Sequence, residues 1–276
     1  MKTTIKLPKA QKSCVHIAEP YLLNPTNPVV VNLIGAGGTG SSMLTALARV
    51  NYALTALNHA GIFVRVFDDD KVSIANRGRQ LFTSSEVGFQ KAVVLVNRIN
   101  RFFGTNWKAV PEKYDVQTLS ETPDYGLATI TISCVDTVAA RFEIASILEA
   151  VTTRNHHYRS RPSYWMDFGN SQYTGQVVLS TTRDIKQPAS KKYKVVPNLP
   201  LVTTEFKDLL IVSEMSDNTP SCSIAEALEK QDLFINSALA DLGASLLWQM
   251  FREGMIFNRG FFLNLKEFRT QPLKVG

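Results

Sequence analysis

The sequence predicts an α/β fold of the doubly wound type, with helices on both faces of a mostly parallel sheet. Three apolar runs carry this prediction: VVVNLI at 29–34, IFVRVF at 62–67 and ATITISC at 128–134. Each is followed along the chain by a helical pattern. The first run leads into closely spaced glycines and the other two lead into aspartates. Alternating strands and helices are typical of parallel sheets, which bind ligands at the carboxyl ends of their strands.

The composition is that of a folded domain. The chain has 276 residues, of which 45% are hydrophobic and 20% are charged, enough to bury a substantial core. No apolar run approaches the roughly 20 residues of a membrane span, and residues 1–20 lack the apolar core of a signal peptide. We therefore expect a cytoplasmic protein without a membrane partner.

The charge and the cysteine content argue against a nucleic-acid-binding protein, a disulfide-rich protein and a cysteine-built zinc site. The net charge of +6 is spread along the chain without a basic stripe, so nucleic acid is not favoured as a partner. A nucleotide or an acidic protein accounts for the surplus equally well. Cys14, Cys134 and Cys222 are far apart and no CxxC pair occurs, so we expect neither a disulfide framework nor a zinc site built from cysteines.

The glycines after the first predicted strand fit a phosphate-binding turn. Gly35, Gly37 and Gly40 match the dinucleotide fingerprint, in which glycine permits a tight turn, close approach of the backbone to phosphate and close helix packing. The free amides of the next helix would face the anion. Glycine turns also occur where packing is the only requirement. The buried face of the helix is predicted from helical spacing to comprise Met43, Leu47, Val50, Leu54 and Leu57.

Asp68, Asp69 and Asp70 follow the second predicted strand. An acidic residue at this place commonly holds a ribose hydroxyl, and a solvated turn rich in aspartate is the alternative. A dense polar set follows, comprising Asn76, Arg77, Arg79 and Gln80. Because this set comes directly after a strand end that would face phosphate, we interpret it as part of a site.

Two more helices are predicted, one after the second strand and one after the third, where the helical pattern runs through Leu148. Thr83 and Glu86 form a capping box, so we expect a helix to start there, to carry Lys91 in its second turn and to end at Gly104. Asp136 follows the third strand. It either caps the next helix or holds Mg²⁺ through its oxygen atoms, with a triphosphate completing the coordination shell.

The C-terminal part gives weaker signals. Residues 164–168 and 175–179 predict two strands, and 180–220 predict a long loop with short strands around Leu201 and Leu209. Residues 260–276 predict one last strand and a tail.

A long helix is predicted between that loop and the last strand. Ser223 and Glu226 form its capping box. Its buried face would comprise Ile224, Leu228, Ile235, Leu239, Leu242, Leu246 and Met250. Cys222 lies just before its N-cap, where the helix dipole favours a thiolate, a setting of nucleophilic cysteines; a structural cysteine is the alternative.

Five motifs occur in an order that resembles the ThiF/MoeB/HesA family of ubiquitin-activating-type adenylating enzymes. They are GAGGTGS, DDDKVSIANRGRQLF, VGFQKA, CVDTVAAR and GQV. Beyond Ser180, the TPSCS segment and the ending GFFLNL look most like ThiF-type proteins encoded in PRTRC gene cassettes. The resemblance implies a Rossmann-like fold with an arm at 1–28 and an ATP-binding adenylation core at 29–180. Residues 181–276 would supply the crossover loop, long helix and C-terminal strand of the same domain.

The resemblance implies a role for each matching position. Family members bind Mg-ATP and attach AMP to the C-terminal carboxylate of a ubiquitin-like protein, and some then pass the acyl group to a cysteine. Asp68 would hold the ribose, Arg79 and Lys91 would neutralise the triphosphate, Asp136 would hold Mg²⁺, and Cys222 is a hypothetical acyl acceptor. The implied nucleotide-binding residues are Gly35, Gly37, Gly38, Gly40, Asp68, Asp70, Asn76, Arg79, Gln80 and Lys91.

A small ubiquitin-like protein substrate and a homodimer are implied in the same way. No zinc is expected, since this chain lacks the two CxxC pairs that many relatives carry. Arg77 replaces a leucine usual in the motif, which leaves open which arginine contacts phosphate. Two alternatives remain. A non-catalytic nucleotide- or protein-binding module would keep the fold, and an NAD-dependent oxidoreductase would suit the glycines but give Arg79, Lys91 and Asp136 no role.

Overall fold

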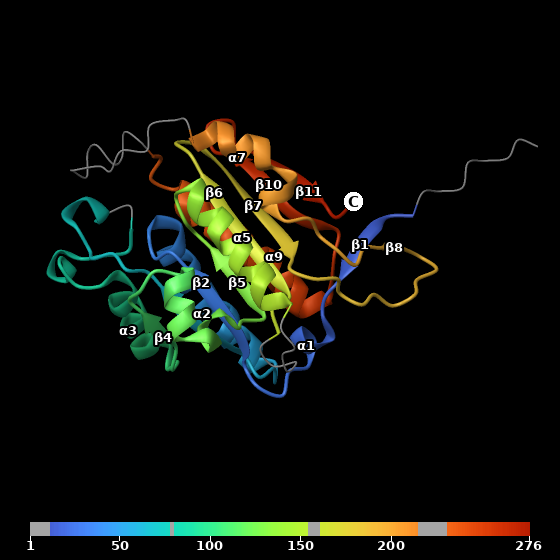
Figure 1. The fold of residues 1–276 in the computed structure, drawn as a ribbon, viewed down its shortest axis with the longest axis horizontal. Helices are drawn as coiled ribbons and strands as arrows, with labels where there is room; N and C mark the ends of the chain where they lie inside the picture. Colours follow the sequence, from blue (N-terminus) through green and yellow to red (C-terminus); the bar gives the residue numbers. More distant parts are fainter. Residues whose placement is uncertain (1–11, 78–79, 154–160, 215–230) are drawn as a thin grey trace, which may run out of the picture.

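The computed structural model describes residues 12–77, 80–153, 161–214 and 231–276 (Figure 1). These residues form an eight-stranded sheet in the order β11-β10-β7-β6-β5-β2-β3-β4. The strands are β2 (Val29–Ile34), β3 (Ile62–Phe67), β4 (Lys108–Val110), β5 (Ile130–Ser133), β6 (Tyr164–Asn170), β7 (Thr174–Thr181), β10 (Asn258–Asn264) and β11 (Arg269–Lys274). From β4 to β6 neighbouring strands are parallel, and from β6 to β11 they are antiparallel. The predicted α/β class with a mostly parallel sheet is confirmed.

The strand order reverses at β2, which has β3 on one side and β5 on the other. The chain first runs outward from β2 through β3 to β4 and then returns to β5 and β6. In register, Ile34 at the end of β2 lies beside Phe67 of β3 and Ser133 of β5. Ligands of doubly wound sheets bind at such a reversal, beyond the carboxyl ends of the strands.

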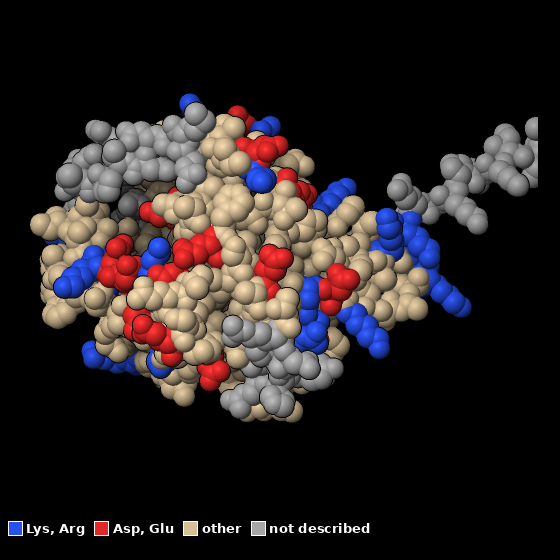
Figure 2. Space-filling model, in the orientation of Figure 1, with Lys and Arg blue, Asp and Glu red and all other residues tan. Residues whose placement is uncertain are grey.

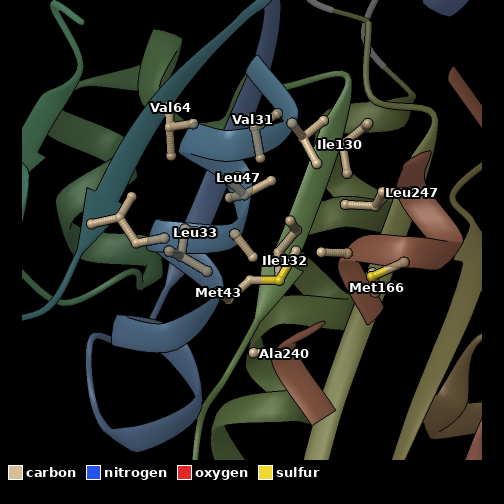
Figure 3. Packing of buried hydrophobic residues seen from close by; sticks show 14 of the residues in the cluster. Val31, Leu33, Met43, Leu47, Val64, Ile130, Ile132, Met166, Ala240 and Leu247 are labelled. Atoms are coloured by element: carbon tan, nitrogen blue, oxygen red, sulfur yellow. The ribbon is translucent and has the colours of Figure 1, made fainter. Parts of the chain in front are cut away.

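Helices cover both faces of the sheet. α2 (Gly38–Ala56), α3 (Lys91–Phe103) and α9 (Ile235–Glu253) pack on one face. Figure 3 shows Met43 and Leu47 of α2 and Leu247 of α9 meeting side chains of β2, β3, β5 and β6. α5 (Val138–Thr152), α6 (Val202–Glu205) and α7 (Lys207–Glu214) contribute to a second apolar cluster, on the other face. Helices bury the parallel strands on both faces of the sheet, and this is why these strands carry apolar side chains on both sides.

Smaller elements complete the chain. β1 (Cys14–Ile17), within the predicted arm, pairs with β8 (Lys194–Val195) and β9 (Met255–Ile256) in a second sheet. α1 (Pro20–Leu23) and α4 (Val116–Glu121) are short helices, and η1 (Ile74–Asn76), η2 (Ser84–Glu86) and η3 (Pro123–Gly126) are 3₁₀ turns. No described helix has the length and apolar character that a bilayer crossing requires.

The helix predicted to start at Thr83 begins later. The capping box of Thr83 and Glu86 is present, but it closes the 3₁₀ turn η2. Gly88 then takes a φ of +92°, which a right-handed helix cannot accommodate. α3 therefore begins at Lys91, so this lysine is the first residue of the helix and not part of its second turn.

Three C-terminal predictions are wrong in detail. Leu201 immediately precedes the short helix α6 and Leu209 lies in α7, so the region holds helices in place of the two predicted strands. The last segment forms the hairpin of β10 and β11 in place of one strand and a tail. Its turn places Phe268 at a φ of +50°.

The long helix is shorter than predicted within the described chain. Residues 231–234 are not helical, and α9 begins at Ile235; Ser223 and Glu226 lie outside the described residues. Leu242 is 41% exposed, although its spacing placed it on the buried face. Leu57, predicted to be buried, likewise lies beyond the end of α2 and is exposed.

The packing of α9 on the sheet can be tested with two leucines of the same helix. Leu247 is fully buried, so Leu247→Ala should lower the free energy of unfolding by about 2–5 kcal/mol. Leu242→Ala should change it by less than about 0.5 kcal/mol because Leu242 lies at the surface. Urea unfolding of both variants measures the difference, and equal losses would contradict the described face of α9.

Candidate nucleotide-binding site

A pocket of about 540 Å³ lies where the strand order reverses. Its wall is built from the glycine turn after β2, the aspartates after β3, the segment 112–114 after β4 and the segment 134–137 after β5. It is closed by Asn170 at the end of β6, by Gln231 before α9 and by Asn236 in the first turn of α9. The carboxyl ends of four parallel strands thus contribute to one cavity, and the sequence placed site residues after three of them, β2, β3 and β5.

Two glycines of the turn are required by the chain's own backbone. Gly35 has a φ of +90°, and a β-carbon on it would lie 2.7 Å from the carbonyl oxygen of Cys134. A β-carbon on Gly40 would lie 1.9 Å from the carbonyl oxygen of Gly35. Both contacts are shorter than any side chain tolerates, so these positions admit only glycine.

Gly37 differs, because the described chain does not fill the space beside it. A β-carbon there would meet only Nε2 of Gln80, at 4.0 Å. Gly37 is also the N-cap of α2, and no described side chain caps that helix end. The open backbone and the uncapped amides leave room for an anion beside the turn. Gly38, by contrast, faces Asn236, whose side chain would lie 2.6 Å from a β-carbon.

Asp68 joins the end of β3 to the glycine turn. Its Oδ2 accepts a 2.6 Å hydrogen bond from the backbone amide of Ala36, and its Oδ1 accepts one of 3.0 Å from the amide of Asp70. Burial of the carboxyl group raises its pKa to about 6, although the hydrogen bond from Ala36 and the charge of Lys91 oppose the shift. Asp68 is therefore a desolvated acceptor at the place where a ribose was predicted.

Lys91 is a buried cation in the pocket wall. The residue is 6% exposed, and its Nζ lies 2.7 Å from Oδ2 of Asp70. Its backbone amide donates to the carbonyl oxygen of Asp70 at 2.9 Å. The structure thus buries the ammonium group beside the predicted phosphate site.

The polar set after β3 is only partly at the pocket. Gln80 is buried in the pocket wall, and its Oε1 has no hydrogen-bond partner among the described residues. The side-chain oxygen of Asn76 instead accepts from the amide of Ser73 and closes η1, and Asn76 does not line the pocket. Its contact with phosphate stays a prediction. Arg79 lies outside the described residues.

Asp136 lines the pocket with an exposed carboxylate. Thr137 caps α5 in its place, since Thr137 Oγ1 accepts from the amide of Ala140 at 3.3 Å. The capping alternative for Asp136 is therefore wrong. No described residue forms a hydrogen bond or ion pair with its side chain, which leaves its oxygens available to a ligand. The described chain has no group of three or more histidine, cysteine or acidic residues suited to a metal.

One cysteine lies in the pocket wall, and the cysteine with a predicted role lies outside the described residues. Cys134 lines the pocket beside the glycine turn, and burial raises the pKa of its thiol, as expected for a structural cysteine in an apolar strand. Cys222 lies outside the described residues, so its role stays a prediction.

Sequence reasoning missed two polar networks that support the pocket. In the first, Asn236 Oδ1 accepts from Thr39 Oγ1 at 2.8 Å and from Asn170 Nδ2 at 2.9 Å. In the second, Arg141 pairs with Asp167, a carboxylate buried within β6. An acidic residue inside the apolar run YWMDF was the available signal for the second network, since a buried charge requires a partner.

These features define a nucleotide-binding type of α/β fold, and comparison with known proteins places it in a family. The sequence profile of the ThiF family matches residues 26–270, so the chain belongs to the ThiF family. The predicted resemblance is thereby confirmed, while the PRTRC subtype stays a prediction.

Relatives of known sequence and structure agree with this placement. Ubiquitin-like modifier-activating enzyme 5 of Drosophila ananassae is 30% identical over 127 residues, which cover 41% of this chain and 29% of that protein. Among solved structures, PaaA superposes with a TM-score of 0.57 and 16% identity, and E. coli MccB with 0.55 and 16%. Each match covers 90% of this chain and 64% of the other, so the chain spans less than two thirds of these relatives. At this identity the structures show a shared fold.

The two kinds of glycine predict different mutant phenotypes. Gly40→Ala should destabilise the protein by about 3 kcal/mol or more, because backbone atoms must move to admit the methyl group. Gly37→Ala should cost less, about 1–2 kcal/mol, because the space beside Gly37 is open but its ψ of −147° lies outside the regions that alanine favours. It should also weaken nucleotide binding about tenfold by blocking approach to the backbone. Thermal unfolding and calorimetric titration with ATP measure both, and unaltered ATP affinity in Gly37→Ala would contradict the assigned contact.

The raised pKa of Asp68 predicts a pH-dependent stability difference. Between about pH 4 and pH 6 the unfolded carboxyl ionises while the folded one retains its proton, so wild type loses stability as pH rises. Relative to wild type, Asp68→Asn should therefore gain about 2 kcal/mol between pH 4 and pH 7. Denaturant unfolding of both proteins across this range measures the gain. A difference that does not change with pH would show that Asp68 ionises normally.

Proposed function

We propose that this protein is an ATP-dependent adenylating enzyme that activates the C-terminal carboxylate of a small ubiquitin-like protein. The observation that carries the proposal is the convergence of four features on one pocket: the glycine turn, Asp68, Lys91 and Asp136. A phosphate-binding turn and an acceptor for ribose would suit any nucleotide. A buried lysine and a carboxylate that no described residue pairs with suit a triphosphate with its metal ion.

The pocket has a size and lining suited to ATP. Its volume of about 540 Å³ lies within the usual range of small-molecule sites. Phe67, Val135 and Ile144 form an apolar part that suits the base, and the glycine turn forms the part that suits phosphate. E. coli MccB, which shares the fold, has been solved with ATP.

The charge of the pocket favours a nucleotide that arrives with a cation. Its described lining carries six acidic residues and two lysines: Asp68, Asp69, Asp70, Glu112, Asp136 and Glu143, against Lys91 and Lys113. Lys91 pairs with Asp70, and Lys113 lies 3.6 Å from Glu143. In Figure 2, by contrast, lysine and arginine side chains gather at the end of the molecule that carries β1 and β8. A bare triphosphate would be repelled by the remaining carboxylates.

A magnesium ion fits this donor set. Mg²⁺ is commonly held by one or two carboxylates together with substrate phosphates, and Asp136 supplies a carboxylate in the pocket that has no partner within the described part of the chain. The bound ion would neutralise charge on the triphosphate. Lys91 would supply a second, buried positive charge, and Arg79 a third.

The proposed reaction needs positioning more than proton transfer. A carboxylate oxygen of the partner's last residue attacks the α-phosphorus of ATP and forms a new phosphorus–oxygen bond. The bond from that phosphorus to the bridging oxygen breaks, and pyrophosphate leaves with the electron pair. No general base is needed because the attacking carboxylate is already ionised at neutral pH. Charge moves toward the pyrophosphate, so fixed cations around the phosphates would stabilise the transition state.

The substrate assignment is supported by the relatives named ubiquitin-like modifier-activating enzyme 5 and by the motif resemblance. Transfer of the acyl group to Cys222, action as a homodimer and a cytoplasmic location belong to the same proposal. A non-catalytic module would not need the buried ammonium group of Lys91 beside the nucleotide. An NAD-dependent oxidoreductase would leave Lys91 and Asp136 without a role.

Pyrophosphate exchange tests the proposal. Wild type should exchange labelled pyrophosphate into ATP only when a suitable ubiquitin-like protein is present. Lys91→Ala and Asp136→Ala should each lower the exchange rate about 100-fold or more, because each removes charge stabilisation of the transition state. Cys222→Ala should retain exchange, since adenylation precedes transfer to a cysteine.

Asp241→Ala is the matched control, because Asp241 is an exposed aspartate of α9 outside the pocket. It should exchange at the wild-type rate. Absence of exchange with every ubiquitin-like partner encoded in the same genome would overturn adenylation of this substrate class. Reduction of NAD by the protein would favour the oxidoreductase.

A further inference from the structure

The guanidinium group of Arg141 clamps the backbone on both sides of Asp136. Its Nη2 donates to the carbonyl oxygen of Val135 at 2.8 Å, and its Nη1 donates to that of Thr137 at 3.3 Å. These two residues flank Asp136 in the chain. Since both neighbouring carbonyls bond the same planar group, the peptide units around Asp136 are held in one orientation.

The clamp is anchored to the centre of the sheet. Nε of Arg141 donates to both carboxylate oxygens of Asp167, at 3.1 and 3.2 Å, and Nη2 also donates to the carbonyl oxygen of Phe168 at 2.9 Å. Asp167 accepts a 2.6 Å hydrogen bond from Ser133 Oγ, which in turn accepts from Trp165 Nε1 at 2.7 Å. The side chain of Arg141 thus ties the loop after β5 to Asp167 and Phe168 of β6, and through Asp167 to Ser133 of β5.

Stability alone does not explain this network. Arg141 is 5% exposed and Asp167 is fully buried, and burial raises the pKa of the Asp167 carboxyl despite the neighbouring guanidinium. Buried ion pairs often contribute no more stability than apolar residues of similar volume, because both ions lose their hydration. Three bonds from one guanidinium to backbone carbonyls indicate a geometric role, since that fork positions a loop in a way that an apolar side chain cannot.

We infer that Arg141 is a positioning residue, which fixes the Asp136 carboxylate for a magnesium–nucleotide complex through the carbonyls of Val135 and Thr137. The inference rests on the assignment of Asp136 to magnesium in the proposed function. Arg141 itself does not line the pocket, so it acts through the loop. Lysine keeps the charge but lacks the planar fork, and Arg141→Lys therefore separates geometry from charge.

The test is the effect of Mg²⁺ on ATP affinity, measured by calorimetric titration with and without EDTA. The dissociation constant of ATP in EDTA, divided by that in Mg²⁺, reports how much the metal ion strengthens ATP binding. This ratio is measured without turnover. Asp136→Ala should lower this ratio at least about tenfold, and Arg141→Lys should lower it by a similar factor, as loss of an outer-shell contact does at metal sites. The double variant should show no further loss than Asp136→Ala, because Arg141 acts through Asp136.

Arg65→Lys is the matched control. Arg65 of β3 is also largely buried and donates to backbone carbonyls, those of Asp124 and Leu127, which precede β5. Its substitution should lower thermal stability and leave the metal ratio at the wild-type value. If Arg141→Lys does not fold, Ser133→Ala removes the support of Asp167 more gently and should lower the ratio about threefold.

Three results would overturn the inference: a wild-type ratio in Arg141→Lys, a larger loss in the double variant than in Asp136→Ala, or no effect of Mg²⁺ on wild type. Failure of the proposed function gives a different pattern. If exchange is absent with every partner while the ratios behave as expected, adenylation is overturned and the positioning role of Arg141 is supported.

Discussion

The close approach of α2 to the turn that precedes it is the constraint on which the site depends. The Gly40 backbone lies against the carbonyl oxygen of Gly35, and Gly35 lies against that of Cys134. Three chain segments therefore meet with no side chain between them. Because β3 and β5 flank β2 in parallel register, this contact also brings Asp68 and Asp136 to opposite sides of one turn. Any substituent at these glycines would separate the ends of the strands that form the pocket.

Local sequence patterns predicted the fold correctly wherever the hydrophobic pattern of a strand or a helix continued along a whole segment. The runs at 29–34, 62–67 and 128–134 are strands because β-rich apolar residues continue until a glycine or an aspartate. Prediction failed where a single residue overrode the pattern, as Gly88 does before α3 with its positive φ. It also failed after Thr181, where packing on α5 and the sheet, and not periodicity, determines that short helices form.

The candidate site likewise contains some residues that local patterns predicted and some that they did not. Gly37, Asp68 and Asp136 lie at the pocket as their motifs indicated, because each follows a parallel strand directly. The burial of Lys91 was not predictable from its helix, since its environment comes from the preceding loop. The pairing of Arg141 with Asp167 joins positions 26 residues apart on different elements, and no local spacing reports such a contact.

The hydrogen bond between Thr39 and Asn236 joins residues 197 positions apart. Asn236 also occupies the space beside Gly38, so the glycine turn is completed by a residue from the last fifth of the chain. A fragment ending after β7 would contain all five motifs of the ThiF resemblance and yet lack α9, the helix that covers α2. The segment that carries the five motifs is therefore shorter than the segment needed to fix the conformation of the glycine turn. Truncation or recombination after β7 would keep these motifs and remove α9, which packs on α2.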